Sequence, residues 1–287
     1  MVSVVYEAPE LIEDAVNLLA NSKIKANVLA GGTDLIIQMQ GDQEKRLVVD
    51  LKKIPSMMQA TLSDDGLALG PSMACAELTA RDDIKAVYPG LVESAYLIGS
   101  TQVQGRCSLG GNLCNSSPAA DTIPALIANN AQCLIVGPSG ERSVAAEDFV
   151  TGVAQNVMEK GELLAMINIP RPAANTSDAY LRFIPRTEMD IAVAGAGVSV
   201  TLDADGTCTA ARVVIGAVAI TALLVPEAAA ALIGTKLDDA ALQAAADAAS
   251  AASKPITDRR GTVEYRTHVV GVLVKRAAKI AAQRTGE

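Results

Sequence analysis

The chain has 287 residues, a formal net charge of −8 and a pI near 4.8, and this negative field would repel nucleic acid. Hydrophobic residues make up 50% of the sequence, which is enough for the cores of two or three compact units. Aromatic residues make up only 2%, so few rings are available for stacking.

Residues 1–56 are predicted to form a small α/β unit. Apolar periodicity and turn signals predict strands at 2–6, 26–29 and 46–50 and helices at 9–20 and 34–39. Thr33 stands where the second helix would be capped.

Residues 57–172 are predicted to form a second, α+β unit. The pattern predicts strands at 67–69, 133–136 and 163–169 and helices at 76–81, 87–95 and from Ser117-Pro118 to about 130. The run from 98 to 117 is rich in Gly, Ser and Asn and is predicted to be mainly loop. A linker is predicted at 170–177.

Residues 173–287 are predicted to form a third unit with a small antiparallel sheet and helices. Alternation at 192–201 and 209–218, with a tight turn at 203–206, predicts a hairpin. An Ala-rich stretch at 226–253 predicts two helices separated at Gly234, and 263–283 predicts a longer amphipathic helix. The fold class is therefore α+β.

Cysteine and histidine usage narrows the chemistry. Five cysteines without a C-x-x-C pair argue against a disulfide framework or an iron–sulfur site within this chain. A single histidine, His268, removes His-based metal cages, and no metal ligands are predicted. No secretory signal is visible and the longest apolar stretch is too short to cross a membrane, so we expect a soluble, cytoplasmic protein.

Two glycine pairs are the most informative motifs. Gly31-Gly32 and Gly110-Gly111 each follow an apolar or turn segment and precede a predicted helix. Glycine lets the main chain approach a ligand closely, and a helix N-terminus offers unpaired N–H groups, so two such segments suggest one diphosphate held from both sides. Neither pair has the Rossmann or P-loop spacing, which argues against a nicotinamide or ATP fold.

A polar run after the second pair completes a nucleotide half-site. Asn112, Ser117 and Asp121 place an amide, a hydroxyl and a carboxylate within a short span. Asp121 could accept hydrogen bonds from a ribose, and the alternative is that it only favours the positive start of its own helix.

Four motifs in register resemble one family. They are Ala-Gly-Gly-Thr-Asp-Leu at 30–35, Leu-Gly-Gly-Asn-Leu at 109–113 leading into Ser-Pro-Ala-Ala-Asp at 117–121, Ile-Asn-Ile-Pro at 167–170, and Arg-Thr-Glu-Met-Asp-Ile-Ala at 186–192. In order and spacing they resemble the FAD-binding medium subunit of molybdenum hydroxylases, the group of xanthine dehydrogenase and carbon monoxide dehydrogenase. The resemblance implies a two-lobed FAD-binding domain of the PCMH type, followed by a C-terminal sheet with a helical bundle.

The resemblance also implies the cofactor site. The two glycine segments would bind the pyrophosphate, Asp121 the ribose and Leu164 the adenine region. Arg182 stands where the family often has a lysine near the flavin. Tyr180 stands where some members place a ring beside the isoalloxazine, the alternative being that it packs the linker. The predicted FAD-binding residues are Ala30, Gly31, Gly32, Thr33, Asp34, Leu35, Ser108, Gly110, Gly111, Asn112, Ser117, Asp121, Leu164, Tyr180 and Arg182.

One segment departs from the family. Gln104-Gly105 stands where the family usually has Arg-Asn, which could change a contact to flavin or to a partner chain. Arg106 could partly substitute, and Ser108 supplies a hydroxyl where the family has Thr.

The resemblance implies an electron-transfer oxidoreductase subunit without a catalytic acid or base of its own. Electrons would pass from two [2Fe-2S] clusters of a small partner chain through FAD to an external acceptor, and a large partner chain would carry the molybdenum cofactor. The expected assembly is a dimer of heterotrimers. The alternatives are a self-contained FAD-dependent oxidase or reductase of the same fold, and a flavin-free scaffold subunit.

Overall fold

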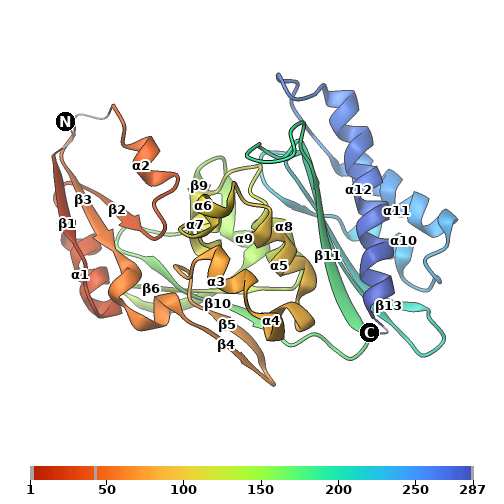
Figure 1. The fold of residues 1–287 in the computed structure, drawn as a ribbon, viewed down its shortest axis with the longest axis horizontal. Coiled ribbons are helices and arrows are strands. Elements are labelled where there is room, and N and C mark those ends of the chain that lie inside the picture. Colours follow the sequence, from red (N-terminus) through yellow and green to blue (C-terminus); the bar gives the residue numbers. More distant parts are fainter. Residues whose placement is uncertain (1–2, 42–43, 286–287) are drawn as a thin grey trace.

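The computed structural model describes residues 3–41 and 44–285. Figure 1 shows the three larger sheets placed side by side along the long axis, with the N-terminal unit at one end and helices α10–α12 at the other. The prediction of an α+β chain with a C-terminal antiparallel sheet and helices is confirmed. None of the helices in the described part of the chain is long and apolar enough to span a membrane.

The N-terminal unit is a parallel sheet with the strand order β1–β3–β2. Helix α1 lies between this sheet and the next, because its buried face (Ala15, Val16 and Leu19) joins a core that includes Leu163 of the second sheet. Leu29 pairs beside Asp50, so β2 and β3 end at the same edge. The elements are β1 Val4–Glu7, α1 Ile12–Asn21, β2 Lys25–Leu29, α2 Leu35–Gln38 and β3 Arg46–Asp50, followed by 3₁₀ turns at Leu51–Lys53 and Pro55–Met58.

The predicted elements of this unit are all found, with shifted ends; residue 2, where the first strand was predicted to begin, lies outside the described residues. The second helix, α2, has Asp34 rather than Thr33 at its N-cap position, and no side chain caps it. The reason is that Gly32, with φ of +77°, makes the turn out of β2, which leaves Thr33 and Asp34 in a turn before the helix begins.

The middle unit is an antiparallel sheet with the order β4–β5–β10–β6–β7, and its helices bury one face of that sheet. Its strands are β4 Ala60–Ser63, β5 Gly66–Leu69, β6 Gln132–Gly137, β7 Gly140–Ala145 and β10 Leu163–Pro170, with a separate hairpin of β8 Val150–Gly152 and β9 Gln155–Asn156. Its helices are α3 Cys75–Thr79, α4 Asp82–Val87, α5 Pro89–Tyr96, α6 Thr101–Gln104, α7 Leu109–Asn115, α8 Thr122–Ala128 and α9 Ala146–Phe149.

Two predictions in this unit are wrong. The run from 98 to 117 is not mainly loop, because α6 and α7 form there. Helix α7 forms despite two glycines because Ser108 caps it and Leu109 and Leu113 are fully buried. Helix α8 begins at Thr122 rather than at Ser117, which leaves residues 117–121 as a turn between two helices.

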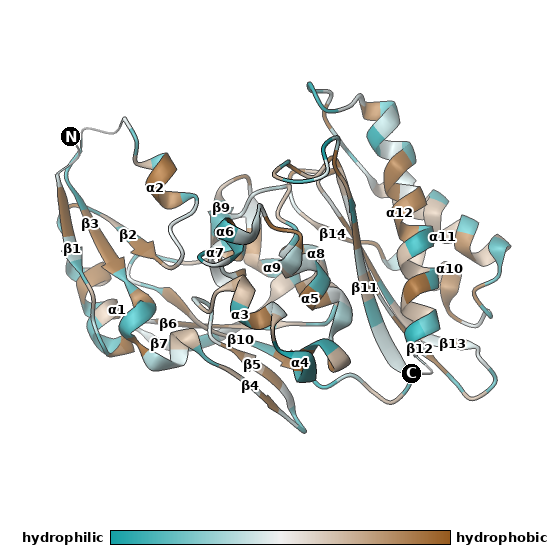
Figure 2. Cartoon of the chain, viewed as in Figure 1, coloured by the Kyte–Doolittle hydropathy of each residue, from teal (hydrophilic) through white to brown (hydrophobic). Residues whose placement is uncertain are grey.

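The C-terminal unit is an antiparallel sheet with the order β11–β12–β13–β14. The predicted hairpin is confirmed as β12 and β13, whereas β11 overlaps the predicted linker. Helix α12 packs on β11 and β12 from one side, and α5 and α8 of the middle unit pack from the other. Figure 2 shows alternating apolar and polar bands along α12. The elements are β11 Thr176–Phe183, β12 Ala194–Leu202, β13 Cys208–Gly216, β14 Leu223–Leu224, α10 Pro226–Leu232, α11 Asp239–Ala252 and α12 Val263–Arg284.

Candidate cofactor-binding site

A cleft of about 810 Å³ lies where the three units meet. Most of its lining comes from residues 26–38, 98–121, 156–164 and 182–192. It brings together every predicted site residue except Tyr180. The predicted residues in its lining are Ala30, Gly31, Gly32, Thr33, Asp34, Leu35, Ser108, Gly110, Gly111, Asn112, Ser117, Asp121, Leu164 and Arg182.

The first glycine segment supplies free hydrogen-bond donors to this cleft. Between Gly31 and Leu35, no backbone N–H group donates to another residue in the described part of the chain. Gly31 also lets two segments touch, because a Cβ atom there would lie 1.9 Å from the carbonyl oxygen of Arg106. A run of unpaired main-chain donors in a concave wall is the chemistry that binds phosphate oxygens.

The second glycine segment differs from its prediction. Gly110 and Gly111 lie inside the first turn of α7, and their N–H groups already donate, to the Pro71 carbonyl at 3.1 Å and to the Ser108 hydroxyl at 3.1 Å. The N–H of Asn112 donates to the Ser108 carbonyl at 2.9 Å. The expected second set of free donors is therefore absent from these positions, since capping and packing use them.

The glycines of α7 instead make room. A Cβ atom at Gly110 would lie 2.3 Å from the Cβ of Pro71, so α7 could not approach that residue with a side chain there. A Cβ atom at Gly111 would lie 3.1 Å from the capping hydroxyl oxygen of Ser108 and 3.9 Å from the Cβ of Ala30, so Gly111 leaves room for the Ser108 cap and faces the first loop. Asn112 fixes the other end of the turn, because its Oδ1 accepts from the Thr122 hydroxyl at 2.7 Å.

A buried ion pair forms the wall nearest the C-terminal unit. The Asp121 carboxylate accepts from Nη1 of Arg182 at 2.6 Å and from the Tyr180 hydroxyl at 2.8 Å, and the side chains of the ion pair are 8% and 5% exposed. Burial raises the pKa of Asp121 to about 6, against the opposing charge of Arg182. At neutral pH the carboxylate is ionised and holds Arg182 in place.

Arg182 keeps unused donor capacity at the cleft. Its Nε–H is buried without a partner among the described residues. A buried guanidinium N–H without an acceptor is costly, and a ligand acceptor in the cleft would remove that cost. Asp121 stands at the N-cap position of α8, where its charge favours the positive start of the helix, but its side chain makes no capping hydrogen bond. Its two oxygens accept from Tyr180 and Arg182, and its contact with a ribose stays a prediction.

Tyr180 does not stand where a stacking ring is needed. Its side chain is 2% exposed, belongs to the core of the middle unit and does not line the cleft. Burial raises the pKa of its phenol, so the hydroxyl stays protonated and donates to Asp121. The structure therefore corrects the stacking expectation, since packing covers both faces of the ring.

In the segment that departs from the family, Gln104 has a structural role. Gln104 is buried and its amide donates to the carbonyls of Tyr96 and Ile98, at 2.5 and 3.2 Å. Gly105 and Arg106 are exposed and do not line the cleft. Gln104 thus anchors α6 to the preceding turn.

Sequence reasoning missed a group that holds the first loop. Lys52 Nζ donates to the Ala30 carbonyl at 2.7 Å and to Asp50 at 2.7 Å, and the Tyr6 hydroxyl donates to the same carboxylate at 2.7 Å. The hydrogen bond and charge of Lys52 keep the pKa of Asp50 low, although burial opposes them. The sequence signal for this group was its position just after β3. Because β2 and β3 are parallel neighbours that end at the same edge, residues after β3 lie close to the first glycine loop after β2.

The sequence analysis also assigned no role to the loop at residues 189–192, which lines the cleft. Met189 and Ile191 line the cleft with about half of each residue exposed, 52% and 53%. Asp190 between them pairs with Arg186 and with Arg260, which precedes α12. This anchoring presents two apolar side chains to the cleft whose lining also includes Arg182.

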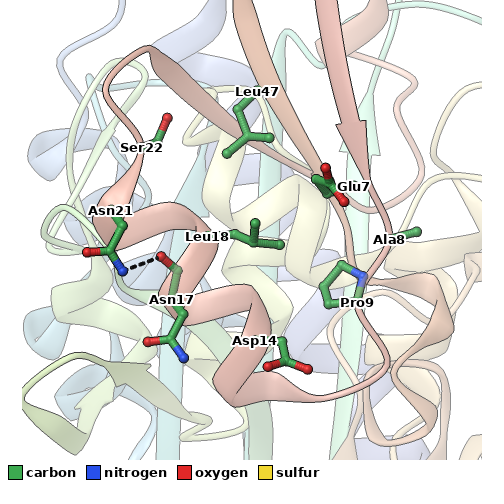
Figure 3. A pocket seen from close by; sticks show the side chains of 9 residues that line it. All are labelled: Glu7, Ala8, Pro9, Asp14, Asn17, Leu18, Asn21, Ser22 and Leu47. Atoms are coloured by element: carbon green, nitrogen blue, oxygen red, sulfur yellow. Dashed lines mark hydrogen bonds between the residues drawn. The ribbon is translucent and has the colours of Figure 1, made fainter.

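A second hollow, of about 600 Å³, lies between β1 and α1 (Figure 3). Glu7 and Asp14 point carboxylates toward it, and no Lys or Arg is among the described residues that line it. Its amide side chains also bond locally, since Asn21 donates to the Asn17 carbonyl at 2.9 Å. The negative charge would repel a diphosphate, so the cleft remains the candidate site.

Comparison with known proteins identifies the family of the chain. Residues 2–172 match the family described as the FAD binding domain in molybdopterin dehydrogenase, and residues 179–281 match the CO dehydrogenase flavoprotein C-terminal domain. The chain therefore belongs to the FAD-binding medium subunits of the molybdenum hydroxylases, as the sequence motifs predict. The predictions of an oxidoreductase subunit and of FAD as its cofactor are confirmed.

Individual relatives cover nearly the whole chain. The carbon monoxide dehydrogenase medium chain of Afipia carboxidovorans is 35% identical over 285 residues, which is 97% of this chain and 96% of that protein. A Cu,Mo-CO dehydrogenase structure matches with a TM-score of 0.93 at 34% identity, covering 99% of both chains. Quinoline 2-oxidoreductase from Pseudomonas putida 86 matches with a TM-score of 0.91 at 25% identity, covering 100% of this chain and 99% of that one.

The residues present fit FAD on structural grounds alone. The cleft offers unpaired N–H groups at 31–35, a wall without side chains at Gly110 and Gly111, and a buried guanidinium donor without an acceptor among the described residues at Arg182. Apolar surface for a flavin or adenine ring comes from Leu164 and Ile191.

Proposed function

We propose that FAD lies in the cleft with its diphosphate against residues 31–35 and that Arg182 donates to an acceptor of the cofactor. When bound, FAD supplies all of the redox chemistry, accepting electrons from iron–sulfur clusters and delivering them to an external acceptor. The chain's own residues bind and orient it and exclude water. The observation that carries the proposal is the run of main-chain donors without partners, in the lining of the same cleft as Arg182, whose buried Nε–H has no acceptor among the described residues.

Each predicted residue has a proposed part in this site. The backbone of Gly31, Gly32, Thr33, Asp34 and Leu35 contacts the diphosphate. Ala30 begins this loop, with its carbonyl held by Lys52, and Gly110, Gly111 and Asn112 shape another part of the wall. Ser108 caps α7, and Ser117 faces the cleft beside Asp121. Asp121 acts mainly by holding Arg182, and Leu164 contacts a ring. Tyr180 positions Asp121 from behind.

We further propose that the chain works in a heterotrimer with a large molybdenum-cofactor subunit and a small iron–sulfur subunit, assembled as a dimer of heterotrimers. The support is its near full-length likeness to medium chains of carbon monoxide dehydrogenase. We propose a cytoplasmic location, which suits five cysteines that are all free thiols in the structure. The proposed units are residues 1–56, 57–172 and 173–287, although Met57 packs into the core of the first.

The diphosphate contact is tested by ligand competition. We expect the full chain, purified with its partner subunits and freed of flavin, to bind FAD much more tightly than FMN, which lacks the diphosphate bridge and adenosine. ADP should compete with FAD, and AMP should compete far less. Equal affinities for FAD and FMN would contradict the placement of the diphosphate at 31–35.

The role of Arg182 is tested by Arg182→Met against Arg276→Met, a change at an exposed arginine of α12 that does not line the cleft. Loss of one hydrogen bond from a charged group corresponds to about 1.5–3 kcal/mol, so we expect Arg182→Met to weaken FAD binding about tenfold or more. Arg276→Met should change it little. Fluorescence titration of the flavin measures both, and equal affinities of the two variants would exclude Arg182 from the site.

A further inference from the structure

Two cysteine side chains face each other across a short antiparallel bridge in the wall of the cleft. The bridge pairs Ala74 with Ser108, and the N–H of Cys75 donates to the Cys107 carbonyl at 2.8 Å. Cys75 and Cys107 are therefore opposite residues joined by one main-chain hydrogen bond, since the N–H of Cys107 donates instead to the Val103 carbonyl at 2.8 Å. Opposite residues of antiparallel strands have Cα atoms about 4.5–5.5 Å apart. A disulfide spans Cα separations of about 4.4–6.8 Å, and opposite residues project to the same side of a bridge.

The two thiols differ in their access to solvent. Cys75 is fully buried at 0% exposure, whereas Cys107 is 6% exposed and lines the cleft. Both belong to the core of the middle unit, which fixes their positions. A small reagent that enters the cleft would therefore meet Cys107 first and find Cys75 directly behind it.

The surroundings also make Cys107 the more reactive sulfur. A hydrogen bond from the Cys75 thiol lowers the pKa of Cys107, although burial and the Asp34 carboxylate oppose this, and the same interaction raises the pKa of Cys75. Cys114 lines the same cleft and is only half-buried, yet burial raises its pKa to about 12. The thiolate is the reactive form of cysteine. Exposure therefore favours Cys114 as the reactive thiol, whereas the lowered pKa favours Cys107.

We propose that Cys107 and Cys75 form a peroxide-sensitive thiol pair, a redox modification site in the wall of the cleft. The Cys107 thiolate attacks one oxygen of hydrogen peroxide, the S–O bond forms as the O–O bond breaks, and hydroxide leaves and takes up a proton to become water. The Cys75 sulfur then attacks the Cys107 sulfur, the S–S bond forms as the S–O bond breaks, and the second water leaves with the Cys75 proton. Two thiols lose two electrons and two protons, and peroxide is reduced to two waters.

The link forms beside the first loop of the cofactor site. The Cα of Cys107 would lie 3.0 Å from a Cβ atom at Gly31, and Ser108, the next residue, caps α7. The disulfide would therefore join α3 to residues 106–108, which contact Gly31 on one side and cap α7 on the other. A dithiol reductant such as dithiothreitol reverses it by thiol–disulfide exchange.

The test is a thiol count on the reduced full chain after one equivalent of hydrogen peroxide, followed by alkylation and mass spectrometry. Of the five thiols, we expect three to remain alkylatable, with a mass loss of two hydrogens that dithiothreitol restores. Trypsin leaves Cys107, Cys114 and Cys133 on one peptide, residues 107–142. In a Cys114→Ser, Cys133→Ser background, Cys107 is the one cysteine of that peptide, so a cross-link between it and the peptide of Cys75 identifies Cys107. Five remaining thiols, or a link that disappears in this background, would overturn the proposal.

Single variants separate the two steps. Cys75→Ser should stop at the sulfenic acid of Cys107, which a dimedone probe labels, and Cys107→Ser should prevent disulfide formation. Cys114→Ser is the matched control from the same cleft and should leave the disulfide unchanged. Dimedone labelling of Cys114 ahead of Cys107 would show that exposure alone decides, contrary to the proposal. Circular dichroism checks that each variant is folded, and the wild-type peptide map decides the outcome by itself.

Discussion

Gly31 offers the sharpest test of how the cleft is built. In Gly31→Ala the new Cβ would lie 1.9 Å from the Arg106 carbonyl oxygen and 2.5 Å from its carbonyl carbon. Ordinary contact begins near 3.4 Å, so the two segments would have to separate by roughly 1.5 Å. Both atoms are backbone, and no side-chain rotation can relieve the clash. Overpacking of this kind costs about 1–3 kcal/mol, and more where backbone must move.

This displacement falls on the cofactor site, because Gly31 begins the run of free N–H donors. We expect Gly31→Ala to lower FAD affinity at least tenfold, which corresponds to about 1.4 kcal/mol. Flavin released by denaturation of the purified complex, and fluorescence titration with FAD, measure the effect. A bulkier residue at Gly31 should remove the flavin entirely.

The control is Gly105→Ala in the neighbouring turn. Gly105 has an ordinary helical φ of −66°, and a Cβ there would meet only the Gln102 carbonyl oxygen at 3.6 Å and the Thr101 oxygen at 3.8 Å. Gly105→Ala should keep full FAD and unchanged stability. If Gly31→Ala and Gly105→Ala bound FAD equally well, the reasoning from the close approach of the two segments would be refuted.

Three further predictions concern charged groups. Arg182→Met should destabilise the fold by about 3–5 kcal/mol because it leaves the buried Asp121 carboxylate unpaired, and adding Asp121→Asn should recover most of this in urea unfolding; additive losses would contradict the coupling. Lys52→Met should weaken FAD binding roughly three- to tenfold by releasing the first glycine loop, whereas Lys53→Met, on an exposed neighbour, should not; equal effects in titration would exclude the loop-holding role. Burial raises the pKa of Asp178 to about 6, so the native state binds more protons than the unfolded state between about pH 4 and 6, and stability from this group falls as pH rises through that window, by roughly 3 kcal/mol. Asp178→Asn should flatten that slope in part, since Asp121 titrates in the same window, and an unchanged pH profile of urea unfolding would show that the carboxyl is already ionised there.

Local pattern was sufficient where the residue types of an element agree with its period. The alternation of residues 192–201 and 209–218 predicts β12 and β13, and the spacing of apolar residues predicts α1 and α12. Strand β11 was missed because it begins with Thr176, Ser177 and Asp178, whose polar side chains continue the pattern of the preceding linker. Asp178 is buried there only because Gly90, Leu91 and Asn129, which are distant in the chain, donate hydrogen bonds to its carboxylate.

The cofactor site also has a part that the sequence determines and a part that only the tertiary structure decides. The sequence by itself determined the family, the cofactor class and the two glycine segments, because these depend on residue types that only a few backbone geometries require. Only the tertiary structure decided which N–H groups are free, since the Pro71 carbonyl and the Ser108 hydroxyl occupy those of α7 and leave those of 31–35 open.

Tyr180 and Lys52 follow the same rule. The sequence motifs predicted that the Tyr180 ring lies near the flavin. In the structure its hydroxyl donates to the buried Asp121 carboxylate and its ring packs in the core of the middle unit. Lys52 carries no motif, and it reaches the first loop only because β2 and β3 are parallel and end together. Residue type determines what a group can bind, whereas contacts between segments distant in the chain decide whether that group is available to a ligand.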